Sequence, residues 1–346
     1  MTKANPDDAN ARQIAELGAA PKITLWTVFV VFAVLNVSHV NAAIESNEYL
    51  INIDHLHKIL KVQRCFAAAP RYLYANSDSA DRLIRRIYWN GDKDVSRQLW
   101  AEGRYIYLPV GEEGCLSYQV SLQGKRNRLS SSRFNQQHPH EFITSIDSWL
   151  WKDSRYQRST KMRIKFVHQR GINVSAPWSL LSRSETETEF LVKYTPDSWA
   201  GMIAFGRFEV EKLPLGNSRL RVAVLAGNNS YHKASIMRWV KKMAGSVASV
   251  GGEFPIKNAQ VLVVLQSGRG EAVPWGQVNR AGGSGVLFIV NPDRPEYELM
   301  ADWTAAHEFS HLLLPYTPDD RWLSEGFASY YQNISRARSG LLDEKT

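Results

Sequence analysis

The sequence predicts an α+β fold in which a β-rich N-terminal part precedes a smaller part that ends in two helices. Residues 44–215 alternate short apolar or β-branched runs with turns rich in Gly, Asn, Ser and Pro, as antiparallel strands do. From residue 216 the pattern changes to strand, helix, strands and two helices. The 346 residues, of which 44% are hydrophobic, are enough for roughly two domains with sizeable cores.

The N-terminus carries an uncharged apolar run that is typical of an export signal. Residues 23–37 are mostly apolar, and Val40 and Ala42 are compact residues at the −3 and −1 positions of a cut after Ala42. We therefore expect residues 1–43 to be a signal peptide. Membrane association through an uncleaved anchor at 23–37 is the alternative, although a spanning helix usually needs about 20 apolar residues. In both cases the rest of the chain is expected outside the cytoplasm, in the periplasm or the extracellular space.

The two cysteines and the charge pattern fit an exported, folded protein. A disulfide between Cys65 and Cys115 would close a loop of about 50 residues and stabilise the fold by about 3–4 kcal/mol. Two buried thiols are the alternative. The net charge of +8 comes from basic residues that interleave with apolar ones, as on the solvated faces of folded elements. We therefore expect no nucleic-acid partner, and the sequence leaves the oligomeric state open.

Within residues 44–215 the strands are expected to form an antiparallel, sandwich-like β-domain. The apolar runs are short, and their β-branched and aromatic side chains suit a pleated, half-buried surface. Two segments, 56–60 and 80–88, are expected to be short helices. The clearest strands are residues 105–110, 116–122, 162–167 and 189–194.

Residues 216–346 are expected to form a second domain. An amphipathic helix is predicted at 232–250, where two glycines end it. Prolines separate two final helices near residues 296–314 and 320–338. Buried strands are predicted at 220–225, 260–265 and 286–290.

The strongest functional signal is a His-Glu-x-x-His pattern in the first of the two final helices. His307 and His311 are four residues apart, so both imidazoles lie on one helix face and can reach a single ion. Glu308 projects beside the coordination position that remains open. Zinc lowers the pKa of its bound water toward about 7, and a neighbouring carboxylate can pass the proton of that water to a leaving amine. The pattern therefore predicts hydrolysis with Glu308 as the general base.

The next helix is expected to supply a third ligand. Hydrolytic zinc sites use three protein ligands and leave the fourth position for water. Glu325 lies near Trp322 and Phe327 in the sequence, which indicates a buried setting that a carboxylate tolerates only with a partner. We expect one Zn²⁺ ion, bound to His307, His311 and Glu325, to be that partner.

These motifs resemble the zinc signature of a known peptidase group. The His-Glu-x-x-His pattern, followed by Trp-Leu-Ser-Glu-Gly-Phe-Ala-Ser-Tyr at 322–330, is similar to the gluzincin metallopeptidases, most closely the aminopeptidase N-like and glycyl aminopeptidase-like families. The resemblance covers residues 305–332. It implies the same three zinc ligands, Glu308 as the general base, a peptide or protein substrate, and a thermolysin-like catalytic domain at 216–346 behind the β-domain.

The sequence departs from these families in the loop between the ligands and in the substrate strand. Glu325 follows His311 by 14 residues, so the connecting loop must be tight. The families carry a glycine-rich strand whose glutamate grips the amino group of the substrate. The stretch Gly282-Gly283-Ser284-Gly285 keeps glycines that let a peptide backbone approach, and lacks the acid. We therefore expect substrate binding at this stretch but leave aminopeptidase specificity open.

A third departure concerns the tyrosine that stabilises the oxyanion. In those families it lies farther downstream of the glutamate ligand than this sequence extends, which leaves a C-terminal truncation open. Tyr316, Tyr330, Tyr331 and His232 are the candidates for a substitute.

Two alternatives to hydrolysis are retained. One is a catalytically inactive zinc-binding homologue that acts as an envelope binding or interaction module, and the other is such a module without a metal. Two further histidine pairs, His55 with His57 and His138 with His140, have no nearby third ligand, so we interpret them as surface residues.

Overall fold

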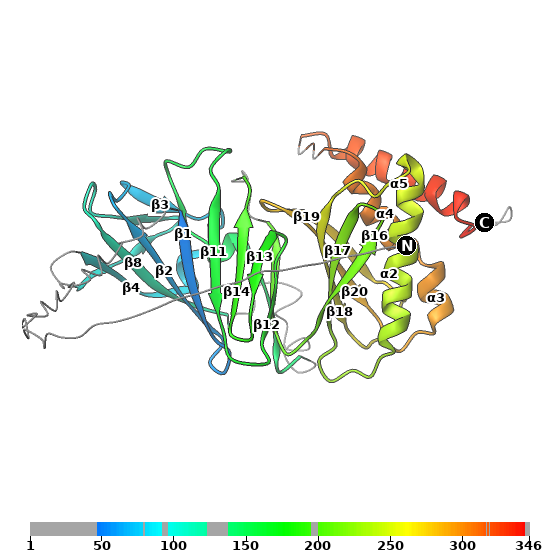
Figure 1. Cartoon of the computed structure of the whole chain (residues 1–346), viewed down its shortest axis with the longest axis horizontal. Coiled ribbons are helices and arrows are strands. Elements are labelled where there is room, and N and C mark those ends of the chain that lie inside the picture. The colour runs from blue at the N-terminus through cyan, green and yellow to red at the C-terminus, as the bar shows by residue number, and fades with distance from the viewer. Residues whose placement is uncertain are drawn as a thin grey trace, which may run out of the picture. The chain divides into compact units, whose positions relative to one another are not determined.

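The structure of the protein, a computed structural model, is mostly β-sheet, with its longer helices in the last third of the sequence (Figure 1). It describes residues 47–78, 80–91, 96–122, 138–194, 200–315, 317 and 319–342, all of which belong to one compact unit, Ala42–Thr346. The predicted signal peptide or anchor at 1–43 lies outside these residues. Among the helices that the structure does describe, none is long and apolar enough to cross a bilayer.

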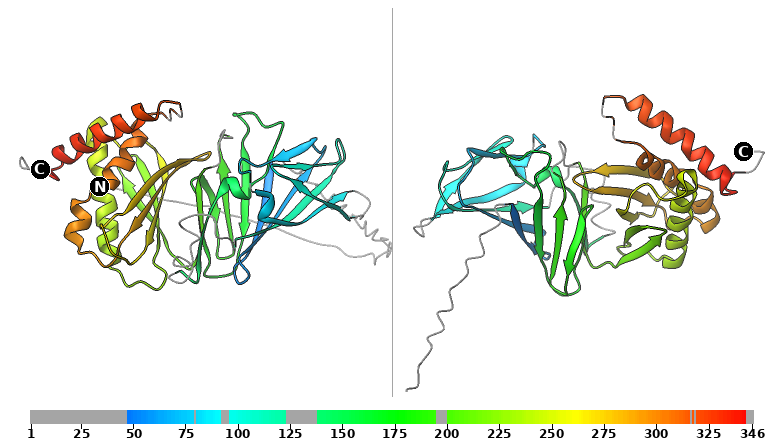
Figure 2. Two further views of the ribbon diagram at one scale, coloured as in Figure 1. Left: turned by 180° about the vertical axis from the view of Figure 1, so that it is seen from behind. Right: turned by 45° about the horizontal axis from the view of Figure 1, so that its top comes forward.

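An eight-stranded sheet is the largest element of the N-terminal part (Figure 2). Alternate residues face its core, as in β8, where Leu116, Tyr118 and Val120 are buried. The expectation of a purely antiparallel domain is wrong at one pairing, because β1 and β11 run parallel. The strands in spatial order are β13 (Ser179–Arg183), β14 (Glu187–Val192), β11 (Met162–Val167), β1 (Glu48–Asp54), β2 (Ile59–Phe66), β8 (Gly114–Ser121), β4 (Ile84–Gly91) and β5 (Ser96–Leu99).

Two smaller sheets complete this part, and broad aromatic side chains fill the core. Leu73 and Ile106, which belong to a four-stranded sheet, are part of the same apolar core as the eight-stranded sheet. The fully buried tryptophans include Trp89, Trp149 and Trp178. The small sheets are β10 (Lys152–Asp153), β3 (Tyr72–Tyr74), β7 (Tyr105–Tyr107) and β6 (Ala101–Glu102), and then β12 (Asn173–Ser175), β15 (Met202–Gly206) and β9 (Glu141–Ser145).

The two short helices expected in the N-terminal part are not present. Residues 55–58 form a turn and β2 begins at Ile59, while η1 (Ala80–Arg82) is a single 3₁₀ turn before β4. Short segments of mixed polarity fit either state, and pairing with β8 makes the later residues of each segment part of a strand.

Cys65 and Cys115 form a disulfide. They lie opposite each other in the antiparallel pair of β2 and β8. The covalent link therefore joins two strands near the middle of the eight-stranded sheet. The sequence left a disulfide and two buried thiols as alternatives, and the disulfide is the one observed.

A five-stranded sheet carries the C-terminal part. Strands β17, β18 and β20 are parallel, with Val222, Val261 and Val286 side by side, and antiparallel strands form both edges. β18 is buried on both faces, which explains its continuous apolar run. The division predicted between residues 215 and 216 falls between two strands that pair with each other. In spatial order the strands are β16 (Val210–Leu215), β17 (Ser218–Leu225), β18 (Asn258–Leu265), β20 (Ser284–Val290) and β19 (Trp275–Arg280).

The helices pack against one face of this sheet. The predicted helix near 232–250 is α2 (Lys233–Gly251), whose buried residues recur at helical spacing, and Gly252 ends it in a left-handed conformation with φ 84°. The helix expected at 296–314 is divided because the backbone is extended at Asp302. Its pieces are α3 (Glu296–Ala301), α4 (Thr304–Ser310) and the 3₁₀ turn η4 (His311–Leu313), and α5 (Arg321–Arg338) follows.

Candidate metal centre

Helix α4 is anchored to the sheet by its apolar face. Ala305, Ala306 and Phe309 are fully buried. The Phe309 ring meets the rings of Phe288 and Phe254 edge to face, with centroids 5.6 and 5.7 Å apart. This packing leaves the polar residues of α4 to face α5 and β19.

His307 lies on α4 and His311 begins η4, where the helix tightens. Their ring centroids are 4.8 Å apart. Arg280 of β19 donates hydrogen bonds to the carbonyl oxygens of His311 and Leu314, at 2.5 and 2.7 Å. These bonds satisfy carbonyl groups that the end of the helix leaves without an intrahelical partner. The edge strand therefore holds the backbone of one candidate ligand in place.

Helix α5 brings Glu325 to the two imidazoles. Glu325 Oε2 lies 3.1 Å from His307 Nε2 and 3.5 Å from His311 Nε2. The buried setting expected for Glu325 is wrong, because its side chain is 63% exposed and Trp322 is 75% exposed. Small residues such as Ala328 form the buried face of α5 instead.

The three side chains can hold one metal ion. One ligand atom of each lies within 4.8 Å of the others. In a tetrahedral zinc site with bonds of about 2.0–2.1 Å, two ligand atoms are roughly 3.3–3.4 Å apart. The separations of 3.1 and 3.5 Å between the glutamate oxygen and the two imidazole nitrogens suit such a site. Two histidines and one glutamate form a donor set of hydrolytic zinc sites, which keep one position for water. The structure thus brings together the three residues that the sequence selected, and the donor set fits zinc.

Glu308 follows His307 on α4 and packs against β19. Its carboxylate accepts a hydrogen bond from the backbone N–H of Val278. Burial raises the pKa of Glu308 to about 7, and the negative charge of Glu325 adds to the effect. A carboxyl group with a pKa near neutrality can both accept and release a proton at pH 7. A bound dication would favour the carboxylate and lower this pKa.

Strand β19 reaches Glu308 through a glycine. A Cβ atom at Gly276 would lie 2.5 Å from Glu308 Cγ and 2.8 Å from Thr304 Cγ2. Only glycine leaves room for the carboxylate at this position. Because β19 is the edge strand of its sheet, its outer side can pair with an extended chain.

The glycine-rich stretch predicted to bind substrate packs against other parts of the protein, whereas Gly276 is the glycine that contacts Glu308. Gly282 and Gly283 form the turn between β19 and β20, and a Cβ atom on either would collide with the segment around Pro177 or with Val192. Ser284 and Gly285 begin β20, and Gly285 faces Gln260. These glycines allow close packing against the N-terminal part. The glycine next to the candidate general base is Gly276, which the sequence analysis missed.

The oxyanion candidates come from three separate segments of the sequence. Tyr316 lies outside the described residues. Tyr330 and Tyr331 follow Glu325 by five and six residues, which turns them about 120–140° away from it around the helix. Tyr330 is 59% exposed. His232 is the N-cap residue of α2, where it contacts Ser235.

One histidine of each weaker pair is buried, while His57 and His140 are exposed as predicted. The surface interpretation is wrong for His55 and His138, which are buried. His138 bonds to Glu141 at 2.7 Å and to the carbonyl oxygen of Leu265 at 2.8 Å, and so links the N-terminal part to β18. His55 contacts the carbonyl oxygen of His140. Buried imidazoles need such partners, and sequence spacing does not reveal them.

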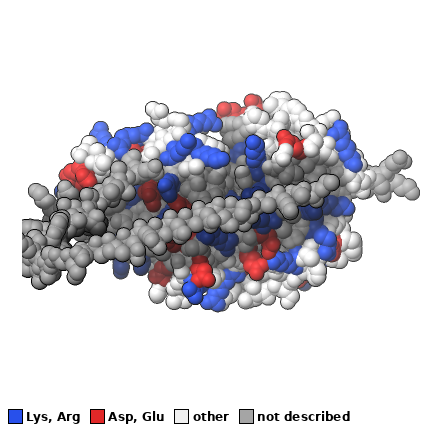
Figure 3. Space-filling model, in the orientation of Figure 1, with Lys and Arg blue, Asp and Glu red and all other residues white. Residues whose placement is uncertain are grey.

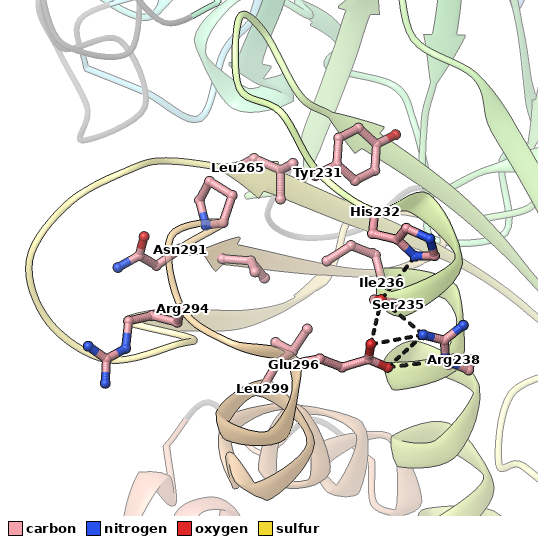
Figure 4. A pocket seen from close by; sticks show the side chains of 12 residues that line it. Tyr231, His232, Ser235, Ile236, Arg238, Leu265, Asn291, Arg294, Glu296 and Leu299 are labelled. Atoms are coloured by element: carbon pink, nitrogen blue, oxygen red, sulfur yellow. Dashed lines mark hydrogen bonds and ion pairs between the residues drawn. The ribbon is translucent and has the colours of Figure 1, made fainter.

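A hollow of about 360 Å³ lies between α3 and the start of α2 (Figure 4). Its polar side chains satisfy one another, since Glu296 accepts hydrogen bonds from Ser235 and Arg238. Of the candidate site residues only His232 lines it. On the face drawn in Figure 3, Lys and Arg alternate with Asp and Glu and do not gather into one patch.

Two polar residues of α5 contact the histidines and were missed from the sequence. Gln332 contacts His307, and Ser324 contacts His311. Gln332 follows Glu325 by seven residues, which is two helical turns, so the same spacing argument that selected the histidines could have found it.

The chain combines an α+β fold with two histidines and one glutamate on neighbouring helices, and comparisons with known proteins bear on the fold. No family model and no curated protein matches the chain. Among solved structures, an aminopeptidase N family protein from Idiomarina loihiensis matches with a TM-score of 0.65 and 15% identity, over 86% of this chain and 55% of that protein. The chain therefore spans about half the length of that relative.

Other solved structures match less closely. An M1 zinc metallopeptidase from Deinococcus radiodurans has a TM-score of 0.47 at 14% identity, over 85% of this chain and 70% of its own. A variant of it bound to a Tyr-Ser-Ala substrate has a TM-score of 0.48 at 13% identity. The protein thus resembles part of the fold of the M1 aminopeptidase N family at low sequence identity.

Proposed function

We propose that the protein is a zinc-dependent metallopeptidase in which His307, His311 and Glu325 bind the ion and Glu308 is the general base. The observation that carries this proposal is the convergence of three ligand atoms within 4.8 Å beside a buried carboxyl group. A structural zinc site would add a fourth protein ligand, whereas this set leaves room for water and substrate.

The chemistry follows from the positions of these groups. Zinc, when bound, acidifies a water molecule and polarises the scissile carbonyl. Glu308 accepts the proton of the attacking water and delivers it to the leaving amine. The hydrogen bond from Val278 and the close contact with Gly276 fix the carboxylate during both transfers.

The edge strand β19 supports a peptide as the substrate. An extended peptide can add to a free sheet edge through hydrogen bonds between main-chain groups. Such binding depends on the peptide backbone rather than on its side chains. Gly276 and Val278 of β19 contact Glu308, so a peptide paired with this strand would pass beside the general base.

The domain layout and the compartment are part of the proposal. Residues 216–346 would form a thermolysin-like catalytic domain behind the β-rich part, and residues 1–43 would direct export or anchor the chain. The disulfide between Cys65 and Cys115 supports export, because disulfides persist in oxidising compartments.

A peptide-cleavage profile tests the function. The full chain, loaded with one equivalent of zinc, is incubated with a peptide library, and the products are identified by mass spectrometry. We expect cleavage that a chelator abolishes and added zinc restores, and the cut positions will report endo- or exopeptidase action. A zinc-loaded chain that cleaves no peptide would favour the inactive zinc-binding homologue, for which the turn of Tyr330 and Tyr331 away from Glu325 around α5 is the supporting observation.

A further inference from the structure

Each imidazole of the candidate site has its outward nitrogen held by α5. His307 Nδ1 lies 3.0 Å from Gln332 Oε1, and His311 Nδ1 lies 3.2 Å from Ser324 Oγ. The Nε2 atoms of both rings face Glu325. Helix α5 therefore contributes one candidate ligand and a partner for each of the two others.

The Gln332 contact determines where the proton of His307 lies. A neutral imidazole carries one proton and can bind a metal only through the other nitrogen. An amide oxygen accepts hydrogen bonds and cannot donate them, so Nδ1 carries a proton in this contact. When an ion lies between Nε2 and Glu325, the ring is neutral, Nδ1 keeps that proton and Nε2 gives its lone pair to the ion. The amide nitrogen of Gln332 points to Asn333 Oδ1 at 3.5 Å, which leaves the oxygen toward His307.

Ser324 restrains His311 less strictly. A hydroxyl group can donate or accept, so it is compatible with either tautomer of the ring. Arg280 fixes the backbone of His311 from the other side. Of the two α5 partners, only Gln332 restricts its histidine ring to a single tautomer.

We propose that Gln332 is a positioning residue that holds His307 in its Nε2-binding form and thereby sets the affinity of the site for zinc. The inference rests on the proposed function in taking zinc as the bound ion. Gln332 is uncharged, so it orients the ring without adding a third carboxylate to a site that already contains Glu308 and Glu325.

The zinc dissociation constant of the full chain, measured by competition with a chromophoric chelator at one pH, tests the proposal. Gln332→Ala removes the acceptor and should weaken zinc binding by about 10–100-fold, the usual cost of losing such an outer partner. Gln332→Glu keeps an acceptor at the same reach and should bind zinc at least as tightly as the wild type. Ser329→Ala, an exposed position on the same helix, is the matched control and should leave the constant unchanged.

A thermal unfolding series separates positioning from a loss of helix stability. The metal-free Gln332→Ala and wild-type proteins should unfold at the same temperature, while the stabilisation that zinc adds should be smaller in the variant. The proposal would be overturned if Gln332→Ala lowered the unfolding temperatures of the metal-free and the zinc-loaded protein equally, relative to the wild type, and Gln332→Glu did not restore them. Gln332 would then only support the helix.

The outcomes also separate this inference from the proposed function. Wild-type zinc affinity in Gln332→Ala, together with peptide cleavage by the wild type, would remove only the role of Gln332. Zinc binding that depends on Gln332 in a chain that cleaves no peptide would remove only the peptidase. A wild-type chain that binds no zinc would remove both.

Discussion

Replacing Glu308 by Gln should lower kcat for peptide hydrolysis by at least about 10²-fold, the scale of general acid–base catalysis, while zinc stays bound. Glutamine has nearly the size of glutamate, so the space beside Gly276 remains filled. Its amide, however, cannot accept the proton of the attacking water. Steady-state kinetics and metal content, measured on the same preparation of the variant, check both halves of the expectation.

The matched control for this variant is Glu298→Gln on α3. Glu298 pairs with Arg294, and the same chemical change there should leave kcat unaltered. Unchanged turnover in Glu308→Gln would remove Glu308 as the general base. Loss of zinc from Glu308→Gln would instead make this carboxylate part of the metal-binding set.

Replacing His311 by Ala should remove zinc and hydrolysis together. The variant keeps only two of the three ligands, and two ligands do not form a closed or a hydrolytic zinc site. We expect less than one tenth of the wild-type zinc content after dialysis and no detectable peptide cleavage, as measured by elemental analysis and product mass spectrometry. Loss of an outer partner of a ligand already weakens metal binding by about 10–100-fold, so loss of the ligand itself should weaken it at least as much.

His57→Ala is the control for this second variant. His57 is 71% exposed and pairs with Asp54, so its loss should change neither zinc content nor turnover. A His311→Ala protein with a full complement of zinc would show that the ion binds elsewhere. Loss of zinc from both variants would point to a general effect of histidine substitution on folding.

The candidate ligands could be found from the sequence because their signal is local. The four-residue spacing of His307 and His311 fixes a shared helix face, and the need for a third ligand directs attention to Glu325, the first acidic residue inside the next helix. The same local reasoning found α2, β17, β18 and β20, whose apolar periodicities are long or unbroken.

The prediction that Glu325 is buried was wrong because burial depends on tertiary packing. Large apolar residues beside it suggested burial, but α5 packs through small residues, Ala328 and Ser335, and turns Trp322 to solvent. Small side chains allow the helices to approach closely, and hydrophobicity alone does not identify the face that does so.

Strand β19 and the parallel pair of β1 and β11 were missed for related reasons. β19 is a polar edge strand with Gly276 in it, so it lacks the apolar pattern by which strands are found. The pairing of β1 with β11 joins segments about a hundred residues apart, and no local pattern encodes such a partner. We therefore propose β19 as the substrate strand, whereas the sequence predicts substrate binding at residues 282–285, which follow β19.

X-ray absorption spectroscopy at the zinc edge of the zinc-loaded chain tests the central claim most directly. The account predicts a first shell of about four nitrogen and oxygen atoms at about 2.0–2.1 Å, with outer-shell scattering from two imidazoles, and the loss of one oxygen in Glu325→Ala. Sulfur in the first shell, scattering from three or more imidazoles, or a spectrum unchanged in Glu325→Ala would contradict it.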